Sequence, residues 1–317
     1  MIALSLRRVT MSAPWLLWSY LAIVTIAELI TALISPQLGL VLHTLLLIGL
    51  ITHAALLPDD GAAKIALALT LAPLIRLLSL SMPLLSFPQM AWYPIVSIPL
   101  LIAMWIIVRQ LGVARRSLGL QRGNIALQLM LVGGGVGLGW IEYVILQPGA
   151  LIPGLSLEAL VWPVLSLVIF TGFTEEVIFR GLLQTLSRPV LGRWAFTYVA
   201  LLFAVLHIGY VSVTDVVFVF AVGFVFAYIV HWSGSILGVT LAHGLTNVTL
   251  FLIMPYLIQH PDHPVAVAAP WIAGSATAVA LLAVAIIARS ALHRDSTPTI
   301  HSGVESDPSA IDHVGTA

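Results

Sequence analysis

Two adjacent carboxylates, Glu175 and Glu176, lie near the end of a long apolar stretch and are followed by Arg180. On a helix, Glu176 and Arg180 share one face because they are four residues apart, and they can form an ion pair. Glu175 is turned by about 100° from Glu176, so it points elsewhere and lacks that partner. An unpaired carboxylate in a low-dielectric site suits a general base. The alternative is an interfacial ion pair beside a second, solvated glutamate.

Two histidines follow on later apolar stretches. Phe203 precedes His207 by four residues, and His243 precedes Asn247 by four residues, so each pair lies on one face of a helix. A single histidine within a membrane is more often a packed, hydrogen-bonded core residue than a catalyst or a metal ligand. Taken alone, His207 and His243 could each be such a packed core residue.

The remaining histidines of the apolar region do not belong to a motif of this kind. We expect His43, His53 and His231 to be packed core residues. His260 and His263 fall in a proline-containing outer loop, where we expect them to be solvated.

Together, the two glutamates, two histidines and one asparagine supply what the hydrolysis of a peptide bond needs. A carboxylate can take a proton from water, an imidazole can orient that water, and an amide or imidazole N–H can stabilise the oxyanion. Glu175, His207 and His243 are also a possible ligand set for zinc, which would polarise the carbonyl and acidify the water. The sequence holds no H-E-x-x-H motif, so a metal site would be assembled from separate helices. The cofactor therefore stays open between zinc and none.

The composition fixes the setting of these residues. Hydrophobic residues make up 60% of the 317 positions and charged residues only 8%, against about 25% charged residues in ordinary soluble domains. This excludes a soluble enzyme and a nucleic-acid binder. The sequence contains no cysteine, which excludes disulfides, thiolate metal sites and a cysteine nucleophile.

The hydropathy predicts an all-α, polytopic transmembrane helical bundle, because a membrane span needs about 20 mostly apolar residues. We count about ten spans (eight to ten), with the candidate catalytic residues on the later ones. The predicted spans are 14–34, 38–57, 64–81, 91–109, 124–147, 155–178, 194–209, 214–231, 235–254 and 268–288.

The basic residues orient the bundle. With the N-terminus in the cytoplasm, every Lys and Arg except Arg76 falls at or near the cytoplasmic side, as the positive-inside rule requires. We therefore predict a multi-pass protein of the plasma membrane with both termini cytoplasmic. The polar segment 289–317 is expected to be a disordered cytoplasmic tail.

Ionisable groups within the bilayer are costly and need a reason. Glu28 and Arg76 both lie about 20 Å along their helices from the cytoplasmic end, so they are expected to form a structural ion pair. Glu142, Glu158 and Asp215 are placed near the outer ends of their spans, where they can reach interfacial water. We assign them no chemistry.

The depths of the candidate catalytic residues do not match on straight spans. Glu175 lies near the cytoplasmic end of its predicted span, whereas His207 is about 20 Å along its helix from Arg193. Either the span of His207 begins deeper, or the helix of Glu175 re-enters the bilayer with a bend at Gly172 or Gly181. Because hydrolysis consumes water, we predict a water-filled cavity that opens to the cytoplasm.

At these residues the chain resembles the CAAX protease and bacteriocin-processing family of intramembrane proteases, which includes type II CAAX prenyl endopeptidases and Abi immunity proteins. The family motifs E-E-x-x-x-R, F-x-x-x-H and H-x-x-x-N appear here in order at 175–180, 203–207 and 243–247. The resemblance covers about residues 155–255. It divides the chain into spans without a motif (1–150), a catalytic core (151–260), a last span (261–288) and the tail.

The resemblance implies a role for each motif residue. Glu175 is expected to be the general base that activates water, helped by His207. His243 and Asn247 are expected to stabilise the oxyanion.

The resemblance also implies that Glu176 and Arg180 shape and hold the site, together with Phe203. Members of the family have been described both as metalloproteases and as glutamate-type proteases, so the resemblance does not decide the metal.

The predicted function is that of an intramembrane endopeptidase acting on a membrane-anchored peptide or protein in the lipid bilayer. Two other classes remain open: a non-enzymatic immunity or scaffold protein, and a proton-coupled transporter that uses the carboxylates as a relay.

Overall fold

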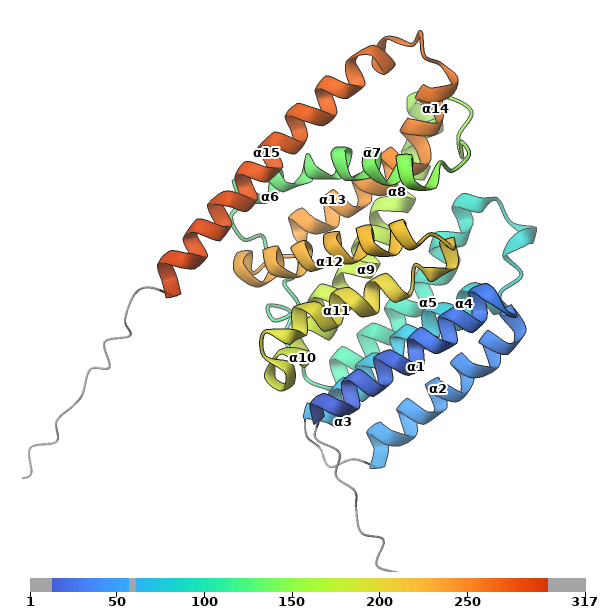
Figure 1. Ribbon diagram of the computed structural model, residues 1–317, viewed down its shortest axis with the longest axis vertical. Coiled ribbons are helices and arrows are strands. Elements are labelled where there is room, and N and C mark those ends of the chain that lie inside the picture. The colour runs from blue at the N-terminus through green and yellow to red at the C-terminus, as the bar shows by residue number, and fades with distance from the viewer. Residues whose placement is uncertain (1–12, 57–60, 296–317) are drawn as a thin grey trace, which may run out of the picture.

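The computed structural model describes residues 13–56 and 61–295, and the regular structure in these ranges is helical (Figure 1). This confirms the predicted all-α bundle. In chain order the elements are α1 (Ala13–Leu33), α2 (Pro36–Leu56), α3 (Gly61–Leu69), α4 (Leu71–Ser81), η1 (Leu84–Ser86), α5 (Gln89–Gln110), α6 (Ile125–Val132), α7 (Gly134–Leu146), α8 (Leu157–Leu167), η2 (Val168–Phe173), α9 (Thr174–Glu176), η3 (Val177–Leu183), α10 (Gln184–Leu191), α11 (Trp194–Val205), η4 (Ile208–Tyr210), α12 (Val213–Ser233), α13 (Leu237–Val248), η5 (Thr249–Ile253), α14 (Met254–Gln259) and α15 (Pro264–Asp295). Here η1 and η4 are 3₁₀ turns, and η2, η3 and η5 are π-helical.

Nine helices among the described residues are long and apolar enough to cross a membrane, so the chain is a multi-pass membrane protein. The predicted span at 194–209 corresponds to Trp194–Tyr210, which is apolar but shorter than a full span. The last helix runs to Asp295, beyond the predicted end of the last span at residue 288. The rest of the predicted tail lies outside the described residues.

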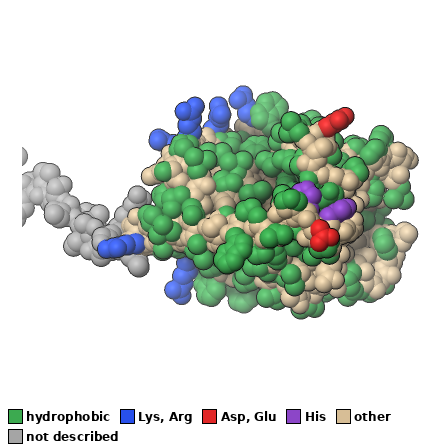
Figure 2. Space-filling model, turned by 90° about the horizontal axis from the view of Figure 1, so that it is seen from above, with side chains coloured by type: hydrophobic (Ala, Val, Ile, Leu, Met, Phe, Trp, Pro, Cys, Tyr) green, Lys and Arg blue, Asp and Glu red, His purple; other side chains and the backbone are tan. Residues whose placement is uncertain are grey.

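The surface agrees with a lipid environment. Figure 2 shows a surface covered largely by hydrophobic side chains, with the visible Lys and Arg on the left half and the visible Asp, Glu and His on the right half. Large apolar side chains such as Trp15, Trp105 and Trp271 are more than half exposed. Exposed apolar surface of this extent is disfavoured in water and stable against acyl chains.

The helices are arranged in two halves around a shared core. α1 to α4 pack together on one side, whereas α6, α7 and α15 pack together on the other (Figure 1). Between them, α11 contacts α1 and α12, and α13 contacts α7 and η2. The helices that carry the three motifs therefore lie in the middle of the bundle.

The helix that carries both glutamates is longer than the sequence predicted. It runs without a break from Leu157 to Leu191, so the predicted end at residue 178 is wrong. The apolar pattern stops at Arg180 and Gln184, but both side chains are buried, and the Gln184 side chain donates a hydrogen bond to the carbonyl of Ala227 (2.9 Å). The helix therefore extends beyond the apolar stretch, because its polar side chains find hydrogen-bond partners inside the bundle.

This length removes the mismatch in depth. Glu175 lies about 24 Å along the helix from Leu191, at 1.5 Å per residue, which is close to the depth expected for His207. Neither a re-entrant helix nor a deeper start of α11 is needed.

Gly172 has a different role from the predicted bend. A Cβ atom at this position would lie 2.8 Å from the carbonyl oxygen of Thr240 and 2.9 Å from the backbone nitrogen of Gly244. Only glycine lets the two backbones approach so closely. The contact brings the glutamate helix directly against α13, which carries His243.

Candidate active site

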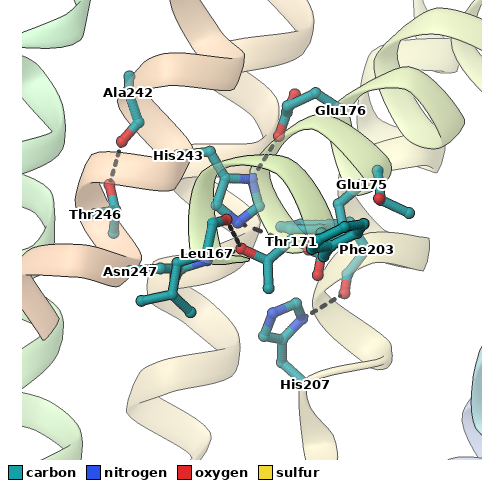
Figure 3. Close-up of polar contacts among 12 residues, drawn as sticks. Leu167, Thr171, Glu175, Glu176, Phe203, His207, Ala242, His243, Thr246 and Asn247 are labelled. Carbon is teal, nitrogen blue, oxygen red and sulfur yellow. Dashed lines mark hydrogen bonds and ion pairs between the residues drawn. The ribbon is translucent and has the colours of Figure 1, made fainter. Parts of the chain in front are cut away.

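The structure brings the polar residues of the three motifs together from three helical stretches. In Figure 3, Glu175, His207 and His243 converge from the glutamate helix, the turn that follows α11, and α13, with Thr171 and Phe203 drawn between the two imidazole rings. These residues lie far apart in the sequence, so their convergence is a property of the fold.

Glu176 is fully buried and has two partners. Its Oε1 accepts a hydrogen bond from Arg180 Nη1 (2.9 Å) and one from His243 Nδ1 (2.8 Å). The ion pair between Glu176 and Arg180 that the sequence predicted is therefore present, and both side chains are no more than 1% exposed. A buried carboxylate is tolerated when it is paired and hydrogen-bonded, as it is here.

Glu175 differs from its neighbour in exposure and in the closeness of its partner. Its side chain is 30% exposed, and its nearest ionic partner is His243, whose Nε2 lies 3.7 Å from Glu175 Oε2. That distance is too long for a direct hydrogen bond. One of the two glutamates is therefore fixed within the bundle, and the other has an accessible carboxylate.

His207 lies just after the end of α11 and is held by a backbone carbonyl of that helix. Its Nδ1 lies 2.9 Å from the carbonyl oxygen of Phe203, and a carbonyl can only accept, so Nδ1 carries the proton. Nε2 is then left with a free lone pair when the ring is neutral.

The ring of Phe203 lies at the centre of the cluster. Its centroid is 4.8 Å from that of His207 and 5.9 Å from that of His243. The guanidinium of Arg180 lies over the same ring, 4.3 Å from its centroid, in a cation–π contact. Phe203 thus separates the two imidazoles and covers the buried ion pair, which agrees with a site-shaping role.

Asn247 is held by a residue that the sequence reasoning missed. Its Nδ2 donates a hydrogen bond to Thr171 Oγ1 (2.8 Å), and the Thr171 hydroxyl donates to the carbonyl of Leu167. Thr171 precedes Glu175 by four residues on the same helix. That spacing was a signal, because it places a polar side chain on the face of the accessible glutamate.

Glu175 and His207 line a common hollow of about 430 Å³. The sequence predicted a cavity open to the cytoplasm, but this hollow lies toward the other end of the bundle. Its wall includes Leu84 of η1, Trp92 near the start of α5 and Tyr210 of η4. These residues lie at helix connections opposite the arginine-rich loops, which are the loops that the sequence analysis assigned to the cytoplasm.

The N-terminal half contributes to this hollow through Arg76. Arg76 donates to Glu28 from Nε (2.9 Å) and from Nη2 (2.6 Å), which confirms the predicted ion pair. Its Nη2 also donates to the carbonyl of Leu206 (2.8 Å), the residue before His207. Arg76 lines the hollow as well, so it is a functional candidate that the motifs did not identify.

Two further acidic residues are placed differently from the prediction. Asp215 is fully buried and Glu142 is 8% exposed, so neither reaches interfacial water. Glu142 lines a small cavity of about 40 Å³ together with Glu176, His243 and Asn247. Glu158 is exposed, as expected.

The prediction of a packed core residue is confirmed for His43, whereas His53 and His231 are only partly buried, although each packs against an aromatic ring. His43 is fully buried beside Glu28, with Nε2 3.4 Å from Oε1. His53 contacts the Tyr20 hydroxyl, and the ring of His231 packs against Phe196.

The donor arrangement does not fit a metal centre. Within residues 13–56 and 61–295, no three side chains of His, Asp or Glu are grouped as ligands for one ion. Glu175, His207 and His243, the set suggested by the sequence, do not form such a group. We therefore derive no catalytic step through zinc.

A comparison with protein families agrees with this geometry. Residues 157–249 match the family model described as type II CAAX prenyl endopeptidase Rce1-like. The match contains all three motifs, confirms the family resemblance and supports a protease of the CAAX type. No curated protein and no solved structure matches the chain.

Proposed function

We propose that this chain, which carries a type II CAAX prenyl endopeptidase Rce1-like domain at residues 157–249, is an intramembrane endopeptidase that hydrolyses a peptide bond through water activated by glutamate and histidine. Its substrate is a membrane-anchored peptide or protein reached within the lipid bilayer. The positive-inside rule supports a plasma-membrane protein whose termini are cytoplasmic.

One observation carries the proposal: two adjacent glutamates have opposite environments. Glu176 is buried and bonded to Arg180 and His243, whereas Glu175 is 30% exposed in a hollow that it shares with His207. A purely structural pair of acidic residues has no need for an accessible carboxylate beside two imidazoles. A hydrolase needs one, because its general base must reach a water molecule.

In the reaction we propose, the oxygen of a water molecule attacks the carbonyl carbon of the scissile bond. Glu175 takes a proton from that water and later delivers it to the leaving amine nitrogen, so the carboxylate is restored. His207 orients the water through the lone pair of Nε2. Glu176 positions His243 by accepting from its Nδ1.

The oxyanion of the tetrahedral intermediate needs donors near the attacked carbonyl. His243 Nε2, when protonated, and the amide of Asn247 are the candidate donors. The hydrogen bond from Asn247 to Thr171 holds the amide in one orientation, so the donor is positioned before substrate binds.

The test is cleavage of a reporter peptide by the purified full chain in lipid vesicles. We expect Glu175→Gln to lower turnover by about 100-fold or more, because a positioned general base contributes on that order. The matched control is Glu158→Gln, which changes an exposed glutamate on the same helix and should leave turnover unchanged. Full turnover of Glu175→Gln would refute the assignment of the base.

A further inference from the structure

The walls of the catalytic hollow come from the ends of helices that meet on one side of the bundle. α4 contributes Ser79 near its C-terminal end, η1 contributes Leu84, and α5 contributes Trp92 and Tyr93 near its N-terminal end. Tyr210, which is 50% exposed, belongs to the connection between α11 and α12. The hollow therefore reaches the end of the bundle where these connections lie.

The catalytic residues are close to that end along α11. His207 is three residues from Tyr210, where the η4 turn ends, which is about one helical turn. Glu175, although central on its own long helix, faces the same hollow. A substrate segment that enters past Tyr210 has only a short distance to travel before it meets both side chains.

The opposite direction is closed by the hydrophobic core. Toward the arginine-rich loops, the helices that form the hollow carry Leu71, Leu182 and Tyr198, all with 0% exposure. These residues belong to one continuous cluster of packed apolar side chains. Interiors packed in this way leave no room for a polypeptide segment.

A separate hollow of about 760 Å³ lies at the arginine end. Its wall includes Arg116, Ser117, Arg188 and Arg193 and extends inward to Arg180, but it contains neither Glu175 nor His207. A substrate bound there has no direct access to the catalytic carboxylate.

The distribution of charge tells which end faces which compartment. The described basic residues other than Arg76 and the buried Arg180 lie at the closed end. On or beside the connections there are Lys64, Arg109, Arg115, Arg116, Arg122, Arg188 and Arg193, and the C-terminal part of α15 carries Arg289 and Arg294. Lys and Arg accumulate on the cytoplasmic side of membrane proteins. The open end of the catalytic hollow is therefore the extracytoplasmic end.

We infer that the catalytic hollow opens to the extracytoplasmic face, and that the substrate is a polypeptide segment presented on that side of the membrane. The inference on substrate rests on the proposed function, whereas the direction of opening does not. A membrane-anchored protein with an extended segment outside the bilayer meets this requirement. A peptide confined to the cytoplasmic surface does not.

The natural absence of cysteine makes a direct test simple. Three near-isosteric single substitutions serve as probes: Ser79→Cys in the catalytic hollow, Ser86→Cys in the exposed loop beside it, and Ser117→Cys in the hollow at the arginine end. A membrane-impermeant maleimide is added to intact cells that express the full chain, and then to permeabilised cells.

We expect Ser79→Cys and Ser86→Cys to react in intact cells, and Ser117→Cys to react only after permeabilisation. The inference is overturned if Ser79→Cys reacts only after permeabilisation or does not react at all. It is also overturned if Ser86→Cys requires permeabilisation, since the chain would then be inserted the other way round.

A second probe guards against a folding defect. Val96→Cys lines the same hollow from α5 and should show the same sidedness as Ser79→Cys. Labelling does not depend on peptide cleavage. The proposed direction of opening and the proposed protease activity can therefore be rejected independently of each other. External labelling of Ser79→Cys in a chain that cleaves no peptide would leave the direction of opening intact and reject the protease.

Discussion

Two groups of buried charges in this molecule look alike in composition and differ in what surrounds them. In the N-terminal half, Glu28 is paired with Arg76 and lies beside His43. In the region that matches the protease family, Glu176 is paired with Arg180 and hydrogen-bonded to His243. Each group thus contains one glutamate, one arginine and one histidine within the bundle.

The difference is the presence of a second carboxylate. Glu176 has Glu175 next to it, and that side chain is 30% exposed to the hollow. Glu28 has no acidic neighbour in the sequence, and both of its oxygens are bonded to Arg76. A charged group inside a membrane protein is therefore not in itself a reason to propose catalysis. The accessible carboxylate beside the buried group is what favours it.

The largest effect that separates the two groups is expected on stability. Glu176→Gln removes the carboxylate that pairs with Arg180, whose side chain is only 1% exposed. Glu28→Gln removes the carboxylate that pairs with Arg76, whose side chain is 17% exposed and lines the hollow. Removing one member of a buried pair costs about 3–5 kcal/mol. We expect Glu176→Gln to lower the free energy of unfolding by an amount in that range. Glu28→Gln should lower it less, because water in the hollow can solvate the guanidinium of Arg76.

The measurement is the unfolding midpoint of each purified variant in the same detergent and lipid, together with the wild type. An equal loss for the two variants would show that exposure of the remaining arginine does not matter, and the contrast between the groups would have to be abandoned.

The histidines of the two groups give the next largest effect, on turnover. His243→Ala removes a proposed oxyanion donor and its contacts with both glutamates. Loss of one oxyanion donor costs about 10²–10³ in turnover. His43→Ala changes a side chain that is fully buried beside Glu28 and does not line the hollow. We expect its turnover per folded molecule to stay within a few-fold of wild type.

Both rates are to be measured with the reporter peptide after the folded fraction has been determined by size-exclusion chromatography. A loss of turnover in His43→Ala that matches that of His243→Ala would mean that the N-terminal group takes part in the chemistry.

The same contrast shows what the sequence can predict. Spacing of four residues correctly predicted the pair between Glu176 and Arg180, since one helix fixes their geometry. Equal depth correctly predicted the pair between Glu28 and Arg76, because an unpaired charge is so costly in lipid that few partners are possible. Predictions of this kind succeed where the physics is local or the alternatives are few.

The errors have a common cause in burial. The predicted span of the glutamate helix ends at residue 178, before the polar Gln184, and Asp215 was assigned to interfacial water because it lies near the outer end of its predicted span. Both side chains are buried between helices. Hydropathy treats a polar residue as a sign of water, whereas a neighbouring helix can supply the same hydrogen bonds, as Ala227 does for Gln184. The sequence alone does not tell which helices are neighbours.

The direction of the hollow was beyond the sequence for a related reason. It depends on where α4, α5 and α11 diverge, and the motifs say nothing about α4 or α5. The contribution of Arg76 to the wall depends on the same packing. The part of the site that lies outside the motif-bearing helices could therefore be found only in the assembled fold.

A smaller effect tests the support of Asn247. Thr171→Val keeps the shape of the side chain and removes the hydroxyl that accepts from the Asn247 amide. Loss of one neutral hydrogen bond is worth about 1 kcal/mol, which corresponds to roughly a five-fold change. We expect turnover to fall by about that factor with the unfolding midpoint little changed, and Thr171→Ser, which keeps the hydroxyl, to restore it.

If Thr171→Val and Thr171→Ser were equally slow, the methyl packing of Thr171 would be responsible rather than the hydrogen bond. Asn247 would then be positioned by the shape of its pocket alone.

The smallest expected effect concerns metal removal, and it separates water activated by the protein from water activated by an ion. Among the described residues, Glu175, His207 and His243 are not gathered into one group of candidate ligands. A general base such as Glu175 acts without a metal if its carboxylate alone takes the proton. We therefore expect turnover to stay unchanged after dialysis against a strong chelator.

A zinc peptidase treated in parallel must lose its activity, so that the chelator is shown to work in the same lipid. Loss of turnover that added zinc restores would mean that substrate binding or a rearrangement of the helices brings Glu175, His207 and His243 together around an ion, and the two histidines would then need to be assigned as ligands.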